Sequence, residues 1–254
     1  MNRELIFRIL KEAKEIGVKE VGLFWIGESL LVKDLPEYVS FAKNIGIDYV
    51  FVTTNGRMAT PERIKKLFDS GLDSIKFSIN AVDREQYIKT LGADGFNQVM
   101  SNLQYAWKYR GDKNRPAIYA STIFDPNKKN DFDAAHALIG PYVDQHYPLQ
   151  LYGQYTFTEP NDNNSSEFYI VNNEGRTLQS MLPCWSLFTE PHISYDGFMS
   201  ACFCDHDEKL YMANLNEMSL MEAWHSEKFV ALRKKHLSKD VKGTVCEDCI
   251  AYKH

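Results

Sequence analysis

Apolar residues along the first 125 or so positions alternate between helical spacing and short uninterrupted runs. The spacing predicts helices over 5–16, 35–44 and 61–70, and the runs predict buried strands over 21–25, 49–53 and 74–79. A helix over 95–109, a strand over 117–123 and a helix over 131–140 continue the pattern. Strand and helix repeat about every 27 residues, a period typical of consecutive βαβ units. The pattern therefore predicts an α/β protein with neighbouring parallel strands and right-handed connections.

The C-terminal part of the chain has a different pattern. Two short apolar stretches flank Asp196 and Gly197, a dipeptide that tolerates the positive φ angles of a tight hairpin turn. Ser219 is followed three residues later by Glu222, which is the signature of a helix capping box. A polar stretch over 159–173 precedes this region and is interpreted as a surface linker.

Composition narrows the class of protein. The 254 residues are 44% hydrophobic and 25% charged, as in ordinary soluble globular proteins. A net charge of -5 argues against nucleic-acid binding, which usually needs a basic face. No apolar run reaches the length of a membrane span, and the charged N-terminus does not resemble a signal peptide. We therefore expect a cytoplasmic protein that binds neither nucleic acid nor membrane.

All five cysteines lie in the C-terminal part, beginning at Cys184. Cys184 and Cys202 form one widely spaced pair, and Cys246 and Cys249 form a C-x2-C pair. Four thiolates in this arrangement can surround an iron–sulfur cluster or a zinc ion, and spacing alone does not separate the two. Cys204 could replace Cys202, although its interpretation as a small buried thiol is preferred. Buried structural thiols or two disulfides are the alternative to a metal site.

Small and polar residues follow the first three predicted strands. Gly27 and Glu28 follow the first strand, Asn55 follows the second, and Ser78 and Asn80 end the third. Ligands of parallel α/β sheets bind at the carboxyl ends of strands, so these residues would face one mouth. Gly27 would let a ligand approach the backbone, Glu28 could hold an ammonium group, and Ser78 or Asn80 could bind sugar hydroxyls. Each residue alone is equally typical of a solvated turn.

Together these segments resemble the radical S-adenosylmethionine superfamily with a C-terminal SPASM/twitch-type auxiliary iron–sulfur domain. Residues 25–31 resemble the family's GGEPLL segment, residues 54–56 match its TNG, and residues 78–80 resemble its serine-bearing strand. Residues 193–197 and 219–224 resemble the two conserved stretches of the auxiliary domain. The resemblance covers nearly the whole chain, and the match in the C-terminal part is the more specific one.

The resemblance implies a fold, a domain division and roles. It implies a partial (β/α)6 TIM-like barrel that lacks its first strand over 1–158, a linker over 159–183 and a small hairpin-and-helix cluster domain over 184–254. Glu28 would contact the amino group of S-adenosylmethionine, and Ser78 and Asn55 would face its ribose and carboxylate. Cys184, Cys202, Cys246 and Cys249 would ligate one auxiliary [4Fe–4S] cluster, with zinc as the alternative metal.

The sequence also departs from the family pattern. No cysteine precedes Cys184, so the C-x3-C-x2-C segment that holds the catalytic cluster is missing from this sequence. Ile26 and Ser29 replace a glycine and the proline of the family segment. We therefore expect a shortened enzyme or a degenerate relative that does not generate a radical. We further expect the strand over 21–25 to be an exposed sheet edge at which the chain associates with itself or a partner.

Two functions of different classes follow. The first is a radical-S-adenosylmethionine/SPASM-like oxidoreductase or peptide- or sugar-modifying enzyme that acts on a small molecule or peptide. The second is a non-catalytic iron–sulfur or zinc protein that uses the residual groove to bind a ligand or partner. A plain TIM-barrel enzyme with a zinc ribbon is a third reading, which leaves the barrel motifs unexplained. Whether the chain is itself an enzyme is left open.

Overall fold

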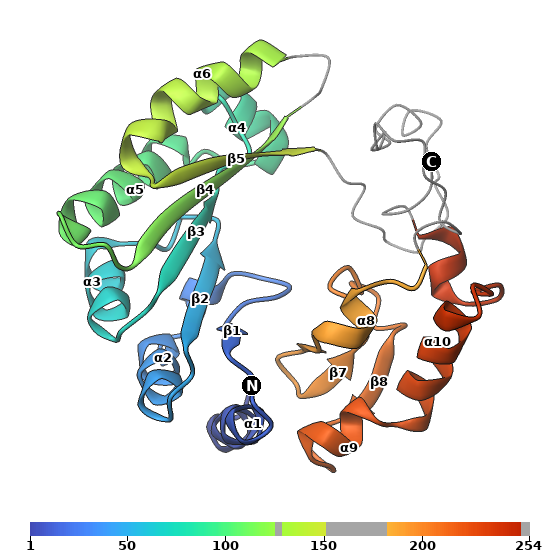
Figure 1. Cartoon of the computed structure of the whole chain (residues 1–254). Coiled ribbons are helices and arrows are strands. Elements are labelled where there is room, and N and C mark those ends of the chain that lie inside the picture. Colours follow the sequence, from blue (N-terminus) through green and yellow to red (C-terminus); the bar gives the residue numbers. More distant parts are fainter. Residues whose placement is uncertain (125–128, 151–181, 250–254) are drawn as a thin grey trace. The chain divides into compact units, whose positions relative to one another are not determined.

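The structure is a computed structural model that describes residues 1–124, 129–150 and 182–249 (Figure 1). Backbone contacts divide the chain into two compact units. Ala13–Gln150 forms one unit, and Met1–Glu12 groups with the C-terminal residues in the other. Most of the predicted linker over 159–183 lies outside the described residues, so its limits stay a prediction.

The unit formed by Ala13–Gln150 is built on a parallel sheet of five strands in chain order. The strands are β1 (Glu20–Gly22), β2 (Tyr49–Thr54), β3 (Ser74–Ser78), β4 (Ala117–Phe124) and β5 (Gln145–Gln150). The register pairs Thr54 with Phe77 and Ser78 with Ser121, so β2, β3 and β4 end close to one another. The prediction of neighbouring parallel strands is confirmed.

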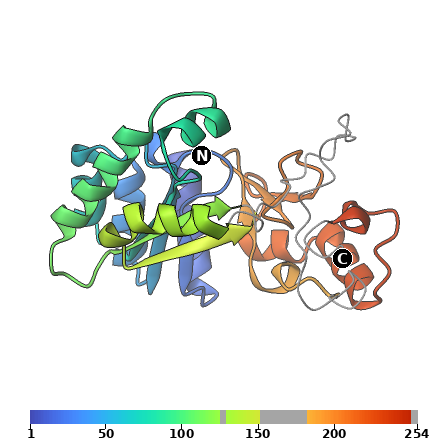
Figure 2. The ribbon, with the colours of Figure 1, turned by 90° about the horizontal axis from the view of Figure 1, so that it is seen from above.

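Helices cover one face of this sheet (Figures 1 and 2). They are α2 (Leu35–Asn44), α3 (Pro61–Asp69), α4 (Arg84–Leu91), α5 (Phe96–Arg110) and α6 (Lys129–Ile139), with the short 3-10 turns η1 (Ser29–Leu31) and η2 (Gly140–Tyr142). Val50, Val52, Ile75 and Phe77 are buried, whereas the residues between them on β2 and β3 are mostly half-buried. Because side chains alternate along a strand, one face of the sheet forms the core with the helices.

Two elements differ from the sequence-based expectation. The strand expected over 21–25 is only Glu20–Gly22, and its residues are half-buried or exposed. Among the described strands β1 pairs with β2 alone, which leaves it fewer neighbours to bury its faces. Helix α4 was not expected; Asp83 caps it by accepting from the Gln86 backbone N–H at 2.8 Å. Association at the β1 edge stays a prediction.

The C-terminal unit contains a three-stranded antiparallel sheet in chain order. Its elements are α8 (Ser186–Thr189), β6 (His192–Ile193), β7 (Phe198–Ser200), β8 (Tyr211–Asn214), α9 (Leu220–Trp224), α10 (Glu227–Leu237) and the 3-10 turn η3 (Val245–Asp248). The predicted hairpin is present: Gly197 has a φ of +96° in the turn between β6 and β7. The third strand, β8, was not predicted.

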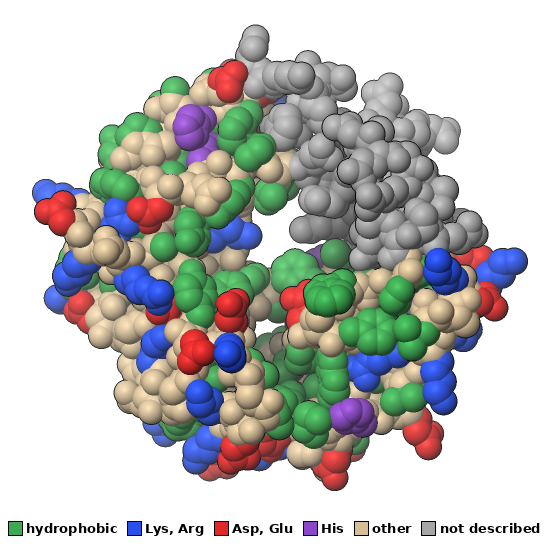
Figure 3. Space-filling model, in the orientation of Figure 1, with side chains coloured by type: hydrophobic (Ala, Val, Ile, Leu, Met, Phe, Trp, Pro, Cys, Tyr) green, Lys and Arg blue, Asp and Glu red, His purple; other side chains and the backbone are tan. Residues whose placement is uncertain are grey.

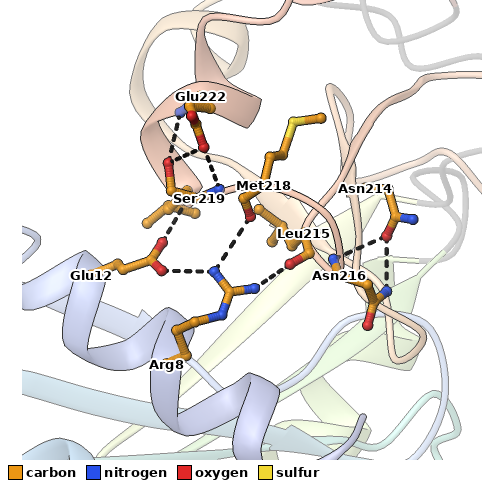
Figure 4. Close-up of polar contacts among 9 residues, drawn as sticks. Arg8, Glu12, Asn214, Leu215, Asn216, Met218, Ser219 and Glu222 are labelled. Carbon is orange, nitrogen blue, oxygen red and sulfur yellow. Dashed lines mark hydrogen bonds and ion pairs between the residues drawn. The ribbon is translucent and has the colours of Figure 1, made fainter.

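Helix α1 (Arg3–Glu15) is clasped to the loop after β8 by two charged side chains (Figure 4). Arg8 donates to the backbone carbonyls of Leu215 and Met218, the latter at 3.3 Å. Glu12 accepts from Arg8 at 2.7 Å and from the Leu220 backbone N–H at 2.6 Å. The clasp explains why Met1–Glu12 groups with residues more than 200 positions away.

The start of α9 is fixed by the predicted capping box (Figure 4). The Ser219 hydroxyl accepts from the Glu222 backbone N–H at 3.3 Å, and the Glu222 carboxylate accepts from the Ser219 backbone N–H at 2.8 Å. Glu12 accepts from the next backbone N–H, that of Leu220. Three of the donors that a helix leaves unpaired at its N-terminus are thus satisfied.

On the face drawn in Figure 3, basic and acidic side chains are interspersed and do not gather into one large basic patch. This distribution accords with the net charge of -5. None of the described helices combines the length and the apolar character that crossing a bilayer requires. The predictions of a cytoplasmic location and of no nucleic-acid partner stay predictions.

Replacing Arg8 by Ala removes the donor of the clasp. We expect the free energy of unfolding of the C-terminal unit to fall by about 1–3 kcal/mol, because hydrogen bonds from charged groups contribute that much. Amide exchange across residues 215–220 should accelerate in hydrogen-exchange mass spectrometry. Glu15→Ala, an exposed change on the same helix, is the control. Unchanged exchange in the Arg8 variant would show that the clasp contributes no stability.

Candidate functional site

The carboxylate of Glu28 joins the carboxyl ends of β1 and β2. Its Oε1 accepts from the Leu30 backbone N–H at 3.0 Å and from the Thr54 hydroxyl at 2.6 Å. Its Oε2 accepts from the Asn55 backbone N–H at 2.7 Å. A carboxylate offers about four acceptor positions, so one position on Oε2 is left for a further donor. Glu28 is thereby oriented and can accept from an ammonium group.

Two glycines shape the backbone around this carboxylate. Gly27 has a φ of +111°, and a Cβ placed there would meet nothing within 4 Å. Gly56 has a φ of +80°, and a Cβ there would lie 2.8 Å from a methyl of Val99. Glycine is required at both positions by the backbone angle, and at Gly56 also by the packing of α5. Gly27 is the more exposed of the two, in keeping with its predicted role as a point of ligand approach.

The other predicted residues lie along the same end of the sheet. Asn55 accepts through Oδ1 from the Arg57 backbone N–H at 3.0 Å, which fixes its amide. Ser78, the last residue of β3, is half-buried and directly follows Phe77, the partner of Thr54. Asn80 accepts through Oδ1 from the backbone N–H of Ile123 at 3.4 Å. Asn80 therefore has a structural bond to the next strand, and its amide nitrogen is left to donate to a ligand.

A chain of hydrogen bonds holds the end of β3 in place. The Thr122 hydroxyl donates to the Ile79 carbonyl at 2.7 Å and lies 2.9 Å from Nε2 of His146. Because the hydroxyl proton is already used, His146 must donate through Nε2. Its Nδ1, 3.2 Å from Nδ1 of His136, is then the acceptor. Burial, together with His136, lowers the pKa of His146 to about 4, so the ring is neutral as this arrangement requires.

Lys76 is a candidate that the sequence analysis missed. It lies on β3 two residues before Ser78, on the face opposite the buried Ile75 and Phe77. Burial lowers the pKa of its ammonium group. A lysine within an otherwise apolar strand pattern was the signal that could have identified it. Its position makes it a candidate for contact with an anionic group.

The four predicted metal ligands come from three places in the C-terminal unit. Cys184 precedes α8, Cys202 follows β7, and Cys246 and Cys249 belong to the η3 turn and its end. The Thr244 hydroxyl caps that turn by accepting from the Cys246 backbone N–H at 3.2 Å. None of the five cysteines forms a disulfide in this structure, so the two disulfides considered as an alternative find no support.

Electrostatic coupling links these thiols. Burial, together with the repulsion of the nearby Cys249 and Cys184 thiolates, raises the pKa of Cys246 to about 12. The pKa of Cys202 is raised by its hydrogen bond with Cys204, by burial and by Cys249. Cys249 thus lies within electrostatic range of both Cys246 and Cys202. Bringing four thiolates together here requires a compensating positive charge, which metal ions supply.

Cys202 and Cys204 differ as candidate ligands. Cys202 is half-buried, and its Sγ accepts from the Cys204 backbone N–H at 3.3 Å, a contact that stabilises a thiolate. Cys204 is exposed, so its interpretation as a small buried thiol was wrong, and its pKa is lowered by the hydrogen bond with Cys202. The coupling of Cys202, and not of Cys204, to Cys249 accords with the preference for Cys202.

The thiols fit a cluster by their chemistry, because they are outside disulfides, partly buried and electrostatically coupled. Among the described residues, no three His, Cys, Asp or Glu side chains are grouped closely enough to hold a single metal ion. A zinc ion needs all four sulfurs about 2.3 Å from one centre, whereas a four-iron cluster takes one thiolate per iron. The ligand assignment itself stays a prediction.

Comparison with known proteins decides the family. The family model of the radical SAM superfamily matches residues 1–136, more than half of the chain. The chain belongs to the radical SAM superfamily. A second family, SPASM, described as an iron-sulfur cluster-binding domain, matches residues 184–250. The resemblance seen in the sequence is confirmed, and membership implies iron–sulfur clusters and binding of AdoMet; zinc finds no support.

Curated relatives match this radical SAM chain over part of its length. A probable GTP 3',8-cyclase of Saccharolobus solfataricus is 35% identical over 106 residues, which are 42% of this chain and 34% of that protein. An uncharacterized protein of Methanocaldococcus jannaschii is 35% identical over 105 residues, or 41% of this chain and 35% of that protein. The matched stretch thus spans about a third of these relatives.

Solved structures share the fold. The enzyme anSMEcpe with bound AdoMet and a peptide superposes with a TM-score of 0.69 at 13% identity, covering 98% of this chain and 78% of that chain. BtrN in complex with AdoMet and 2-DOIA gives a TM-score of 0.54 at 17% identity, covering 93% and 74%. The predicted α/β partial-barrel fold with a small C-terminal domain is confirmed. Absence of radical generation stays a prediction.

The hydrogen bonds that join Thr122, His146 and His136 make the stability of the fold depend on pH. Since the folded state lowers the pKa of His146 from 6.5 to about 4, the unfolded chain binds more protons between these values. Stability therefore rises with pH across that window and is lost as pH falls through it, by on the order of 2 kcal/mol. In His146→Phe this contribution should be absent, so urea-unfolding free energies plotted from pH 7 to pH 4 should fall less steeply. Parallel curves for the two proteins would refute the assignment.

Proposed function

We propose that this chain supplies the AdoMet-binding sheet edge and the auxiliary-cluster domain of a radical SAM/SPASM-type enzyme that modifies a small molecule or peptide. The observation that carries the proposal is the set of four electrostatically coupled cysteines, none of them in a disulfide, in the part that matches SPASM. The neighbours' bound molecules, a peptide in one and 2-DOIA in the other, support a substrate of this size class.

At the sheet edge the residues of this chain have distinct tasks. Glu28, held by Thr54 and Asn55, accepts from the ammonium group of AdoMet through its remaining acceptor position. Ser78 and the amide nitrogens of Asn55 and Asn80 are placed to bind hydroxyl or carboxylate oxygens. Gly27 keeps the backbone accessible beside the carboxylate. AdoMet, when bound to a reduced cluster, is the source of a substrate-oxidising radical in this superfamily.

In the C-terminal unit the chain provides thiolates from three segments. Cys184, Cys202, Cys246 and Cys249 hold an auxiliary [4Fe–4S] cluster, which supplies one-electron redox chemistry when bound. Iron rather than zinc is supported by the SPASM match. Partial burial of the thiols limits access of water to the sulfurs.

Cysteine replacement tests the cluster. Anaerobically reconstituted protein should contain about four irons and four sulfides per chain. Changing Cys202 or Cys246 to Ala should lower the iron content by more than half, because each removes one of four ligands. Cys204→Ala is the matched control and should keep the full content. Full iron content in the Cys202 variant with a loss in the Cys204 variant would move the ligand to Cys204, and a colourless protein with one zinc would refute the cluster.

Glutamate replacement tests the AdoMet site. Glu28→Gln keeps the shape of the side chain but lacks the negative charge that an ammonium group requires. We expect AdoMet to bind about tenfold to a hundredfold more weakly in anaerobic calorimetry, since charged hydrogen bonds contribute about 1.5–3 kcal/mol. Glu62→Gln, an exposed carboxylate on α3, is the control. Equal affinity in the Glu28 variant and the wild type would exclude Glu28 from the site.

A further inference from the structure

His236 occupies a buried position on α10. The helix buries Phe229, Leu232 and His236, which recur at the spacing of one helical face. His236 is only 2% exposed, although lysines precede it at the exposed positions 234 and 235. Burying an imidazole in an apolar stripe is unfavourable unless its ring nitrogens form hydrogen bonds.

One ring nitrogen contacts a predicted cluster ligand. The backbone N–H of Cys184 donates to Nδ1 of His236 at 3.2 Å, across 52 positions of sequence. An accepting Nδ1 carries no proton, so the neutral ring must carry its proton on Nε2. The contact therefore fixes both the backbone of Cys184 and the tautomer of the histidine.

The other ring nitrogen lacks a partner. Nε2 of His236 is buried and has no hydrogen-bond acceptor among the described residues. A buried donor without an acceptor is unfavourable, and native structures rarely leave one. The side chain that is oriented by Cys184 thus offers an unused N–H in the domain that carries the four thiols.

A second side chain of α10 holds the same segment. Arg233, one turn earlier, donates through Nε to the Leu187 carbonyl at 2.8 Å and through Nη1 to the Trp224 carbonyl at 2.6 Å. Its guanidinium also packs on the rings of Trp224 and Phe229, 3.9 and 4.0 Å from their centroids. Arg233 and His236 together fix the stretch from Cys184 to Leu187 against one rigid helix.

We propose that His236 is a positioning and tuning residue for the auxiliary cluster, a proposal that rests on the proposed function. Its Nδ1 holds the Cys184 backbone, and its Nε2–H donates to a sulfur of the ligand–cluster assembly. Metal sites commonly orient their ligands through such outer contacts. Hydrogen bonds to cluster sulfurs stabilise the more negative, reduced state, so this donor raises the reduction potential.

Two complementary variants separate the two nitrogens. His236→Asn keeps an acceptor near the position of Nδ1 and loses the distal donor. His236→Gln keeps a distal N–H and loses the proximal acceptor. Lys234→Ala, an exposed change on the same helix, is the control. Each protein is reconstituted anaerobically as the full chain, its iron is counted, and its cluster is titrated by redox-poised electron paramagnetic resonance.

We expect His236→Asn to retain its iron but to show a ratio of reduced to oxidised cluster about tenfold lower at a fixed potential, which corresponds to about 59 mV. His236→Gln should keep the wild-type midpoint potential but release iron to a chelator several-fold faster. Lys234→Ala should match the wild type in both measurements. If His236→Asn fails to hold iron, the midpoint of His236→Gln decides: an unchanged value supports the donor.

Two results separate failure of this inference from failure of the proposed function. A wild-type protein that takes up no four-iron cluster overturns both. A wild-type protein that holds the cluster while the Asn variant keeps the wild-type midpoint overturns the role of His236 alone. A lowered midpoint in the Gln variant likewise overturns the assignment of the distal N–H as the tuning donor.

Discussion

The parallel pairing of β1 to β5 in chain order is the constraint on which the sheet-edge site depends. Each backbone ladder aligns the carboxyl end of a strand with that of its neighbour, so residues about 25 positions apart become adjacent. Glu28 can reach both the hydroxyl of Thr54 and the backbone of Asn55 only because β1 and β2 end together. Those contacts in turn leave the carboxylate oriented, with a single acceptor position to offer. The chemistry of the edge thus follows from strand register.

Much of this could be predicted because the signals are local. Helices α2, α3 and α5 follow the apolar spacing closely, and the capping box and the glycine turn lie where the sequence indicates. The residues at the carboxyl edge of the sheet could also be predicted, because parallel strands end at a common edge. The short length of β1 could not be predicted, because an isolated apolar run does not indicate how many neighbouring strands will flank it.

Several of the features that were missed depend on contacts distant in sequence. The sequence around Arg8 does not indicate that it binds carbonyls after β8. Its acceptors are backbone carbonyls, which every residue type has, so they leave no signal in the sequence. The bond from His146 to Thr122 likewise joins two strands whose apolar pattern hides the polar pair. His236 could have been identified from the sequence, because it occupies a position in the apolar stripe of α10 where a polar residue is unusual.

The thiols link metal binding to folding of the C-terminal unit. Without metal, burial and mutual repulsion keep Cys246 protonated, as its pKa of about 12 indicates. Binding of iron must therefore displace protons, so affinity rises with pH and the bound state gains the attraction that the thiolates lack alone. Because the predicted ligands come from before α8, after β7 and from η3, one cluster would cross-link three segments of the C-terminal unit. Helix α10 already holds one of these segments through His236 and Arg233, so binding of the cluster and folding of the unit would stabilise each other.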